Sequence, residues 1–166
     1  MSTRKPLYWC LRIAALALII LFFVPMFTVS CAASGQKEEI ADPVSLSQVA
    51  TGTGEAMEMV AEQQKTRTKA YPLVFLFLLV PIAAIAVSFF KKLESLHMFV
   101  FGFTFMAEGI ALIILALSFL TKYESSGIII GTNAFFHIYY FIALICALVS
   151  SGFLLKDVMN YYRYGK

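Results

Sequence analysis

Four continuously apolar stretches dominate the pattern of hydrophobic and polar positions along this chain. They cover residues 7–29, 71–90, 96–120 and 134–155. Each is close to the ~20 residues that a helix needs to cross a hydrocarbon core ~30 Å thick. None shows the alternation of polar and apolar residues that a membrane barrel requires. The pattern predicts an all-α fold, a polytopic membrane four-helix bundle in which residues 1–166 form a single membrane domain.

The basic residues between these spans predict the orientation of the chain. With the N-terminus inside, the cytoplasmic segments hold Arg4, Lys5, Arg12, Lys91, Lys92, Lys156, Arg163 and Lys166. The opposite side then holds Lys37, Lys65, Arg67, Lys69 and Lys122. The excess of Lys and Arg on the first side places both termini in the cytoplasm by the positive-inside rule. We therefore expect a multi-pass protein of the cell membrane.

Aromatic residues and loop composition add detail to this topology. Tyrosine and tryptophan near span ends are expected to anchor the chain at the interface: Tyr8, Trp9, Tyr71, Tyr123, Tyr139, Tyr140, Tyr161 and Tyr162. The outer loops are 31–70 and 122–133. Within the first, acidic residues precede basic ones between Glu55 and Lys69, which complements a helix dipole and predicts a helix there.

Composition agrees with a membrane protein and excludes several functions. Hydrophobic residues make up 60% of the chain and charged residues 14%, and the mean hydropathy is +0.81. Soluble domains are usually about 45–50% apolar and about 25% charged. The net charge of +3 comes without a basic cluster interleaved with aromatics, so no nucleic-acid partner is expected. The expected partners are membrane lipids and either further copies of the chain or a larger membrane complex.

The cysteines and histidines offer little chemistry. The segment Thr28-Val29-Ser30-Cys31 follows basic residues and an apolar run, as in a bacterial lipoprotein signal whose cysteine is lipidated after cleavage. Thr28 replaces the usual aliphatic residue, and we favour the alternative in which the span remains and Cys31 lies at the outer interface. The three cysteines lie at different depths, which predicts no disulfide. His97 and His137 lie at opposite ends of their spans, so no haem, metal or other cofactor is expected.

Glu108 is the outstanding candidate for function. It lies near the centre of the third span, where insertion of an acidic residue such as Asp costs ~2.5–3.5 kcal/mol. Thr104 and Ala111 share its side of the helix at i−4 and i+3, which predicts a small-residue pocket beside the acid. Glu108 is then a carboxyl that handles protons, cations or substrate. The alternative is a neutral acid that donates one hydrogen bond to a neighbouring helix.

Small residues predict where the spans pack. In the fourth span Ala143, Ala147 and Ser151 recur every four residues, a spacing that permits close helix approach. In the third span Gly102, Gly109 and Ala116 recur every seven residues. We expect these two spans to pack as an antiparallel pair. The stripes are most simply internal helix contacts of the four-helix bundle, and the alternative is that one of them binds an outside partner.

Two resemblances bear on the architecture. Residues 22–54 contain Phe-Phe-Val-Pro, then Val-Ser-Cys, Ser-Leu-Ser and Ala-Thr-Gly-Thr-Gly. This series resembles the first outer segment of small uncharacterised bacterial four-span membrane proteins, which implies a bacterial origin and four spans. The layout, with a long first outer loop and a short second, is similar to that of claudin-type proteins. The first loop lacks the paired cysteines and the tryptophan of that family, so this likeness is one of topology alone.

Three functional hypotheses follow. The leading one is a non-enzymatic accessory subunit or self-associating scaffold that acts through helix packing and its outer loop. The second is a small transporter or channel component that uses Glu108. The third is a membrane enzyme, for which Glu124, Asn133, His137 and Tyr139 form the nearest polar cluster, without a nucleophile or metal set.

Overall fold

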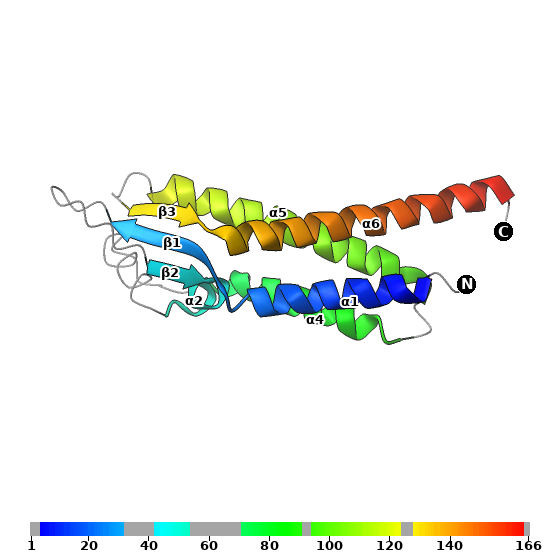
Figure 1. The fold of residues 1–166 in the computed structure, drawn as a ribbon, viewed down its shortest axis with the longest axis horizontal. Coiled ribbons are helices and arrows are strands. Elements are labelled where there is room, and N and C mark those ends of the chain that lie inside the picture. The colour runs from blue at the N-terminus through cyan, green and yellow to red at the C-terminus, as the bar shows by residue number, and fades with distance from the viewer. Residues whose placement is uncertain (1–3, 32–41, 54–70, 91–93, 124–127, 165–166) are drawn as a thin grey trace.

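The computed structural model describes residues 4–31, 42–53, 71–90, 94–123 and 128–164. Long helices run side by side along one axis, and a small sheet lies at one end of the bundle (Figure 1). Both termini lie at the opposite end (Figure 1). We call these two ends the sheet end and the terminal end. The helix predicted over 55–69 lies outside the described residues.

The first apolar stretch forms a helix and then a strand. Helix α1 spans Arg4–Leu21, and strand β1 spans Pro25–Cys31. The helix ends in tighter turns, in which the amides of Phe23 and Val24 donate to carbonyls three residues back, each at 3.1 Å. Pro25 has no amide hydrogen and cannot continue the helix, and the β-branched and aromatic residues after it favour a strand. The span predicted over 7–29 is therefore helical only as far as Leu21.

The sheet joins the two segments that were predicted to be loops. Strands β2 (Asp42–Ser45) and β3 (Ile128–Thr132) pair antiparallel with either side of β1, in the order β2-β1-β3. Thr28 of β1 lies opposite Gly131 of β3. A Cβ at position 131 would lie 2.6 Å from the Thr28 hydroxyl oxygen, so glycine lets the two strands pair without displacing Thr28. The chain is mostly helical as predicted, but the all-α fold does not hold at the sheet end.

A short helix follows the sheet. Helix α2 spans Leu46–Thr51, and Ser45 caps it in a capping box with Gln48. The helix ends at Gly52, whose φ of 70° lies in the left-handed region. The amide of Ser47 donates to the carbonyl of Phe22 at 3.1 Å. The first outer segment is thereby held against the end of α1.

The remaining elements are helical. The 3-10 helix η1 (Pro72–Phe75) leads into α4 (Leu76–Val87), followed by α5 (Glu94–Tyr123) and α6 (Ala134–Tyr164). Pro81 lies inside α4, which nevertheless continues to Val87. Within the described residues, two helices are long and apolar enough to cross a membrane, at Leu96–Ser118 and Ala134–Met159. The apolar helices at Pro6–Leu21 and Pro72–Val87 are shorter.

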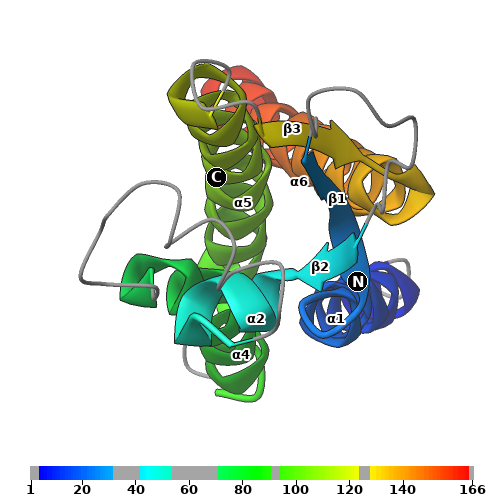
Figure 2. The same ribbon diagram turned by 90° about the vertical axis from the view of Figure 1, so that its left-hand side faces the viewer.

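Helices α5 and α6 pack closely and run in antiparallel directions (Figure 1), and the end-on view of Figure 2 shows them next to each other. A Cβ added at Gly102 would lie 3.2 Å from the Ser150 Cβ, and one added at Gly109 would lie 3.8 Å from the Ala143 Cβ. From the first contact to the second, the position moves forward by seven residues on α5 and back by seven residues on α6, as in an antiparallel pair. Ala116 and Ala147 are also buried. The small-residue stripes thus meet each other inside the chain.

The fourth-span stripe differs from the prediction by one residue. Ser151 is exposed, and Ser150 lies in the interface instead. Ser151 is eight residues after Ala143, a rotation of about 800°, which places it about 80° beyond the side that faces the bundle. Ser150 is seven residues after Ala143, and its rotation of about 700° leaves it within about 20° of that side. The hydroxyl of Ser150 is buried, and among the described residues it has no hydrogen-bond partner.

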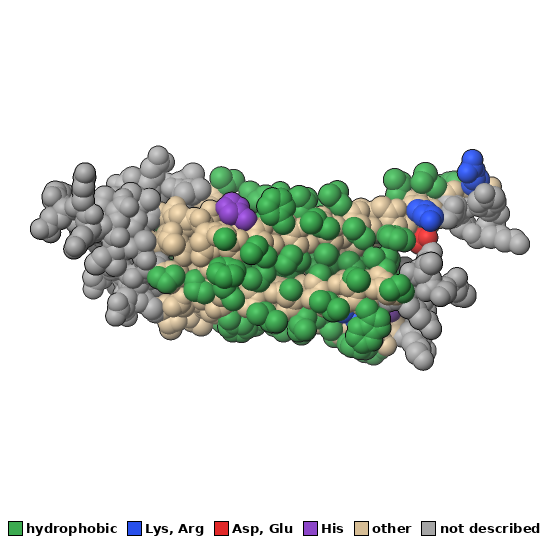
Figure 3. Space-filling view, in the orientation of Figure 1, with side chains coloured by type: hydrophobic (Ala, Val, Ile, Leu, Met, Phe, Trp, Pro, Cys, Tyr) green, Lys and Arg blue, Asp and Glu red, His purple; other side chains and the backbone are tan. Residues whose placement is uncertain are grey.

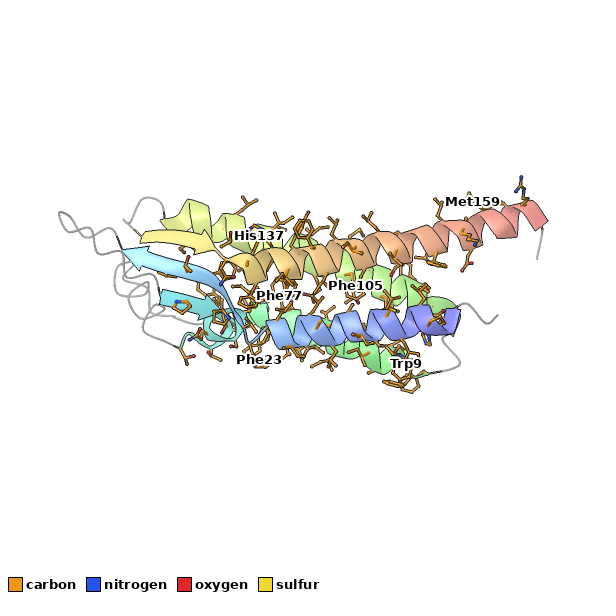
Figure 4. The ribbon with its side chains drawn as sticks, in the orientation of Figure 1. Trp9, Phe23, Phe77, Phe105, His137 and Met159 are labelled. Carbon is orange, nitrogen blue, oxygen red and sulfur yellow. The ribbon has the colours of Figure 1, made fainter. Side chains whose placement is uncertain are left out.

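The outside of the bundle is apolar along its length. Hydrophobic side chains cover the visible face between the two ends, and the described charged side chains that appear there lie mostly toward the terminal end (Figure 3). Trp9 and Phe23 of this outer surface are about 60% exposed, at 60% and 59%. Phe77 and Phe105, by contrast, lie inside the bundle (Figure 4).

Candidate functional site

The candidate site centres on Glu108, which is buried where α5 faces α6. The hydroxyl of Tyr139 donates a hydrogen bond of 2.5 Å to Oε2 of Glu108. Glu108 is 3% exposed and Tyr139 is fully buried. Tyr139 is therefore not the interfacial anchor that its place near a span end predicted. A short bond from a neutral donor to a carboxyl oxygen is among the stronger hydrogen bonds in proteins.

A third helix closes the site. Phe77 of α4 is 6% exposed, and its ring meets that of Tyr139 edge to face at 6.2 Å. The acid therefore lies where α4, α5 and α6 converge. Phe77 and Tyr139 come from segments 62 positions apart in the chain, and the sequence gives no signal that they meet.

Glu108 also lines a cavity of about 410 Å³ between η1, α4 and α5. The wall on α5 is formed by Ala107, Ala111, Ile114 and Ser118, together with the acid. Ala111 thus lies beside Glu108 as predicted. Thr104 is buried one turn away but does not line this cavity, because the lining residues of α5 begin at Ala107 and continue toward the sheet end.

The electrostatics of the site are unusual for an apolar interior. The groups lining the cavity include no Lys, Arg or His. Burying a carboxylate away from water is costly unless a proton, a cation or several hydrogen bonds compensate for the lost hydration. Tyr139 supplies one such bond, and Glu108 has no other hydrogen-bond partner among the described residues.

Arg12, a basic residue inside the first apolar stretch, contacts α4 and not Glu108. Arg12 of α1 donates from Nε to the Ser88 hydroxyl at 2.9 Å and from Nη2 to the Ser88 carbonyl at 2.6 Å. Its guanidinium also lies over the rings of Trp9 and Phe89, at 5.3 and 4.4 Å from their centroids. Arg12 therefore caps the C-terminal end of α4. Ser88 is the acceptor in both of these hydrogen bonds.

The histidines lie apart. His97 is buried near α1, where its Nε2 lies 3.2 Å from the Phe90 carbonyl oxygen and its ring meets that of Tyr8. His137 is exposed toward the sheet end (Figure 4). In the part of the chain that the structure describes, no group of three or more His, Cys, Asp or Glu side chains is placed to hold a metal ion.

Two residues of the polar cluster considered for an enzyme, Asn133 and Tyr139, make hydrogen bonds to other parts of the chain. The side chain of Asn133 caps α6 by accepting from the amide of Phe135 at 3.0 Å, and it donates to the Pro25 carbonyl at 2.7 Å. Tyr139 is committed to Glu108, and Glu124 lies outside the described residues. Asn133 thus ties the start of α6 to β1.

Cys31, the predicted lipidation candidate, is the last residue of β1 and pairs with Ile128 of β3. Its backbone is therefore part of the sheet, and its lipidation remains a prediction. Cys10 is exposed and Cys146 half-buried.

Comparison with known proteins adds no relative: no protein-family model matches the chain, and no curated protein matches it.

Proposed function

We propose that the chain is a non-enzymatic four-span membrane protein that associates with a second copy of itself and serves as a scaffold. Helices α1, η1 with α4, α5 and α6 are the spans in this proposal. The sheet end faces outward and both termini lie in the cytoplasm, the side that holds more Lys and Arg.

The length and the exposed side chains of α1 support its placement as a span. The 18 residues of α1 are about 27 Å long, near the ~30 Å of a hydrocarbon core. Its outward-facing side chains at Ile13, Leu16 and Ile20 are each more than half exposed. An exposed apolar surface of this extent is stable in lipid and is a liability in water.

The observation that carries self-association is an unpartnered apolar stripe along α6. Its positions alternate in steps of three and four, the heptad spacing of coiled coils. They are Ile138, Phe141, Ile145, Leu148, Gly152, Leu155 and Met159. From Ile138 to Met159, the apolar side chains of this α6 stripe are each 46–65% exposed.

The α6 stripe lies opposite the side that packs on the bundle. Ala143, Ala147 and Ser150 face inward, whereas the stripe faces away. The 31 residues of α6 are about 46 Å long, so the helix exceeds the hydrocarbon core by about 16 Å. Its C-terminal part extends past α1 and α5 (Figure 1). Lipid covers the stripe within the membrane, but the exposed side chain of Met159 lies beyond the predicted span 134–155 and needs another partner.

A second copy fits this surface. Two copies in one membrane share the same orientation, so a two-fold axis parallel to the membrane normal brings each stripe position against its own equivalent. Equivalent stripe positions of the two copies then face each other along the whole length of α6, because both helices have the same heptad spacing. Around Leu155 and Met159, the neighbouring charged residues Lys156 and Asp157 lie off the stripe and remain hydrated.

The first experiment is disulfide cross-linking in native membranes. In a background with Cys10, Cys31 and Cys146 replaced by Ser, Met159→Cys is treated with a mild oxidant. We expect a covalent dimer, because stripe positions near the two-fold axis approach within the reach of a disulfide. Asp157→Cys is the matched control, since two residues turn the helix by about 200° and carry that position to the far side.

The intact mass of the tagged protein, purified in mild detergent, completes this test. Two copies that become one after Leu155→Glu with Met159→Glu support the proposal. A single chain before mutation, or equal cross-linking at positions 157 and 159, contradicts it. A stoichiometric unrelated protein in place of the second copy makes the chain an accessory subunit instead.

A second candidate function is favoured by one observation, the cavity beside Glu108. A small transporter or channel component that handles protons or cations needs a polar group inside an apolar bundle. Its test is proton and monovalent-cation flux into liposomes containing the purified chain. Flux that Glu108→Gln abolishes, while the mass of the assembly is unchanged, supports transport.

A further inference from the structure

The cavity between η1, α4 and α5 opens through the side of the bundle. Its volume of about 410 Å³ lies in the range of small-molecule sites, roughly 300–1,000 Å³. Leu73 and Ile114, two residues of its lining, are 78% and 58% exposed. Phe77, near the acid, is 6% exposed. The cavity therefore leads from the lipid-facing surface to the buried carboxyl.

One oxygen of that carboxyl is available at the inner end of the cavity. Oε2 of Glu108 accepts the bond from Tyr139, whereas Oε1 has no hydrogen-bond partner among the described residues. Glu108 is the sole titratable side chain in the lining, and the hydroxyl of Ser118 is already bonded to the Ile114 carbonyl at 2.7 Å. Every other lining side chain is apolar. Oε1 is thus an acceptor in a cavity that offers it no donor.

We propose that this cavity binds a lipophilic amine, which enters from the lipid with its nitrogen directed at Oε1 of Glu108. The hydrocarbon or aromatic body of the amine lies against the apolar wall formed by Leu76, Phe77 and Ile114. Its ammonium group donates to the free carboxyl oxygen. This site is independent of self-association, because it lies on α4 and α5 rather than on the α6 stripe.

The charge of the ligand follows from the charge of the site. A cationic nitrogen compensates a carboxylate whose hydration is lost, and the attraction is stronger in a low-dielectric interior than in water. An anionic ligand is excluded, because the lining contains no cation to receive it. A neutral alcohol of equal size has the same hydrocarbon body but gains only a neutral hydrogen bond, which is weaker than a charge-assisted one.

The test compares an amine with its matched alcohol on the full-length protein in nanodiscs of zwitterionic lipid. Binding of radiolabelled 4-phenylbutylamine is measured by scintillation proximity, with unlabelled 4-phenylbutylamine and 4-phenylbutanol as competitors. We expect saturable binding and an amine preference of about tenfold or more, the value of one charge-assisted bond. Equal competition by the alcohol overturns the proposal and indicates that the cavity holds only lipid-like apolar molecules.

Two variants locate the site. Glu108→Gln keeps the shape of the cavity and is expected to remove the amine preference. Ala111→Phe fills the cavity and is expected to remove binding of both compounds. An amine preference that survives Glu108→Gln, or binding that survives Ala111→Phe, contradicts the proposal. If Glu108→Gln does not fold, Ile114→Phe serves instead, because it narrows the entrance of the cavity without altering the acid. This variant is expected to lower the affinity for the labelled amine at least tenfold. Unchanged affinity would contradict the proposal.

Discussion

The hydroxyl of Tyr139 donates a 2.5 Å hydrogen bond to Oε2 of Glu108 and so joins α6 to α5 at a buried position. Both residues are at most 3% exposed. The bond explains how a carboxyl is accommodated inside an otherwise apolar bundle. It also fixes the acid in place, so that its other oxygen faces the cavity on the α4 side.

The first prediction concerns this bond. Tyr139→Phe removes the donor and leaves a buried carboxyl with one bond fewer, which we expect to lower the free energy of unfolding by about 1–3 kcal/mol. In a double-mutant cycle with Glu108→Gln, we expect a coupling of about 0.6–1.7 kcal/mol, the range for polar pairs between membrane helices. The measurement is reversible unfolding in mixed detergent micelles.

Tyr140→Phe is the control for that cycle. The neighbouring ring is only half-buried, and its hydroxyl makes no hydrogen bond to Glu108. Its effect should remain within about 0.5 kcal/mol. Equal losses from the two tyrosine variants would show that the bond to Glu108 contributes nothing beyond the loss of a hydroxyl.

The second prediction separates the two glycines of α5. Gly109→Ala places its Cβ 3.8 Å from Ala143, an ordinary contact, so the better helix propensity of alanine should stabilise the protein by up to about 1 kcal/mol. Gly102→Ala places its Cβ 3.2 Å from the Ser150 Cβ. That crowding should cancel or reverse the gain, and Gly102→Val should destabilise by about 1–3 kcal/mol.

Thermal unfolding of the purified variants measures this difference. Ser150→Gly removes the opposing Cβ and should restore the benefit of Gly102→Ala in the double variant. If Gly102→Ala stabilises the protein as much as Gly109→Ala does, Gly102 does not lie in close contact with Ser150, and the packing of α5 on α6 differs from the one described.

Helices α5 and α6 were predictable from the sequence because a continuous apolar run of about 20 residues is a signal contained in a single segment. The predicted span 96–120 lies within α5, and 134–155 lies within α6. The extension of α6 to Tyr164 was missed, because Lys156 and Asp157 end the apolar run without breaking the helix. Span length alone therefore defines the membrane-embedded part of a helix but not the helix itself.

The sheet and the site depend on distant pairs, which a single sequence does not reveal. Strand β1 pairs with β3, about 100 residues later in the chain, and neither strand has a recognisable partner until the fold brings them together. Glu108 was identified because an acid stands out in an apolar span. Tyr139 was not identified as the hydrogen-bond partner of Glu108, because a tyrosine near a span end is equally typical of an interfacial anchor.

The third prediction concerns the cap on α4. Arg12→Lys keeps the positive charge but loses the two-pronged geometry that reaches both oxygens of Ser88. Arg12→Ala should lower the free energy of unfolding by about 1.5–3 kcal/mol, and Arg12→Lys should recover less than half of that loss. Arg163→Ala, an exposed change on α6, is the control and should be nearly neutral. Full recovery in Arg12→Lys would mean that charge alone, without the fork, accounts for the contact.

The fourth prediction tests the pairing of β1 with β3. Gly131→Ala sets a Cβ 2.6 Å from the Thr28 hydroxyl oxygen, so that either the Thr28 side chain must rotate or the strands must move apart. We expect a loss of about 1–3 kcal/mol in the free energy of unfolding, together with faster hydrogen exchange of the amides of Thr28 and Ser30, which the register directs toward β3. Thr28→Ala removes the obstructing oxygen, so the double variant should recover most of the loss. Thr28→Val retains a side chain of the same size and should not rescue Gly131→Ala, because a methyl group then occupies the same space. Losses that simply add in the Thr28→Ala double variant would show that these two residues do not face each other, and the register of the sheet would have to be redrawn.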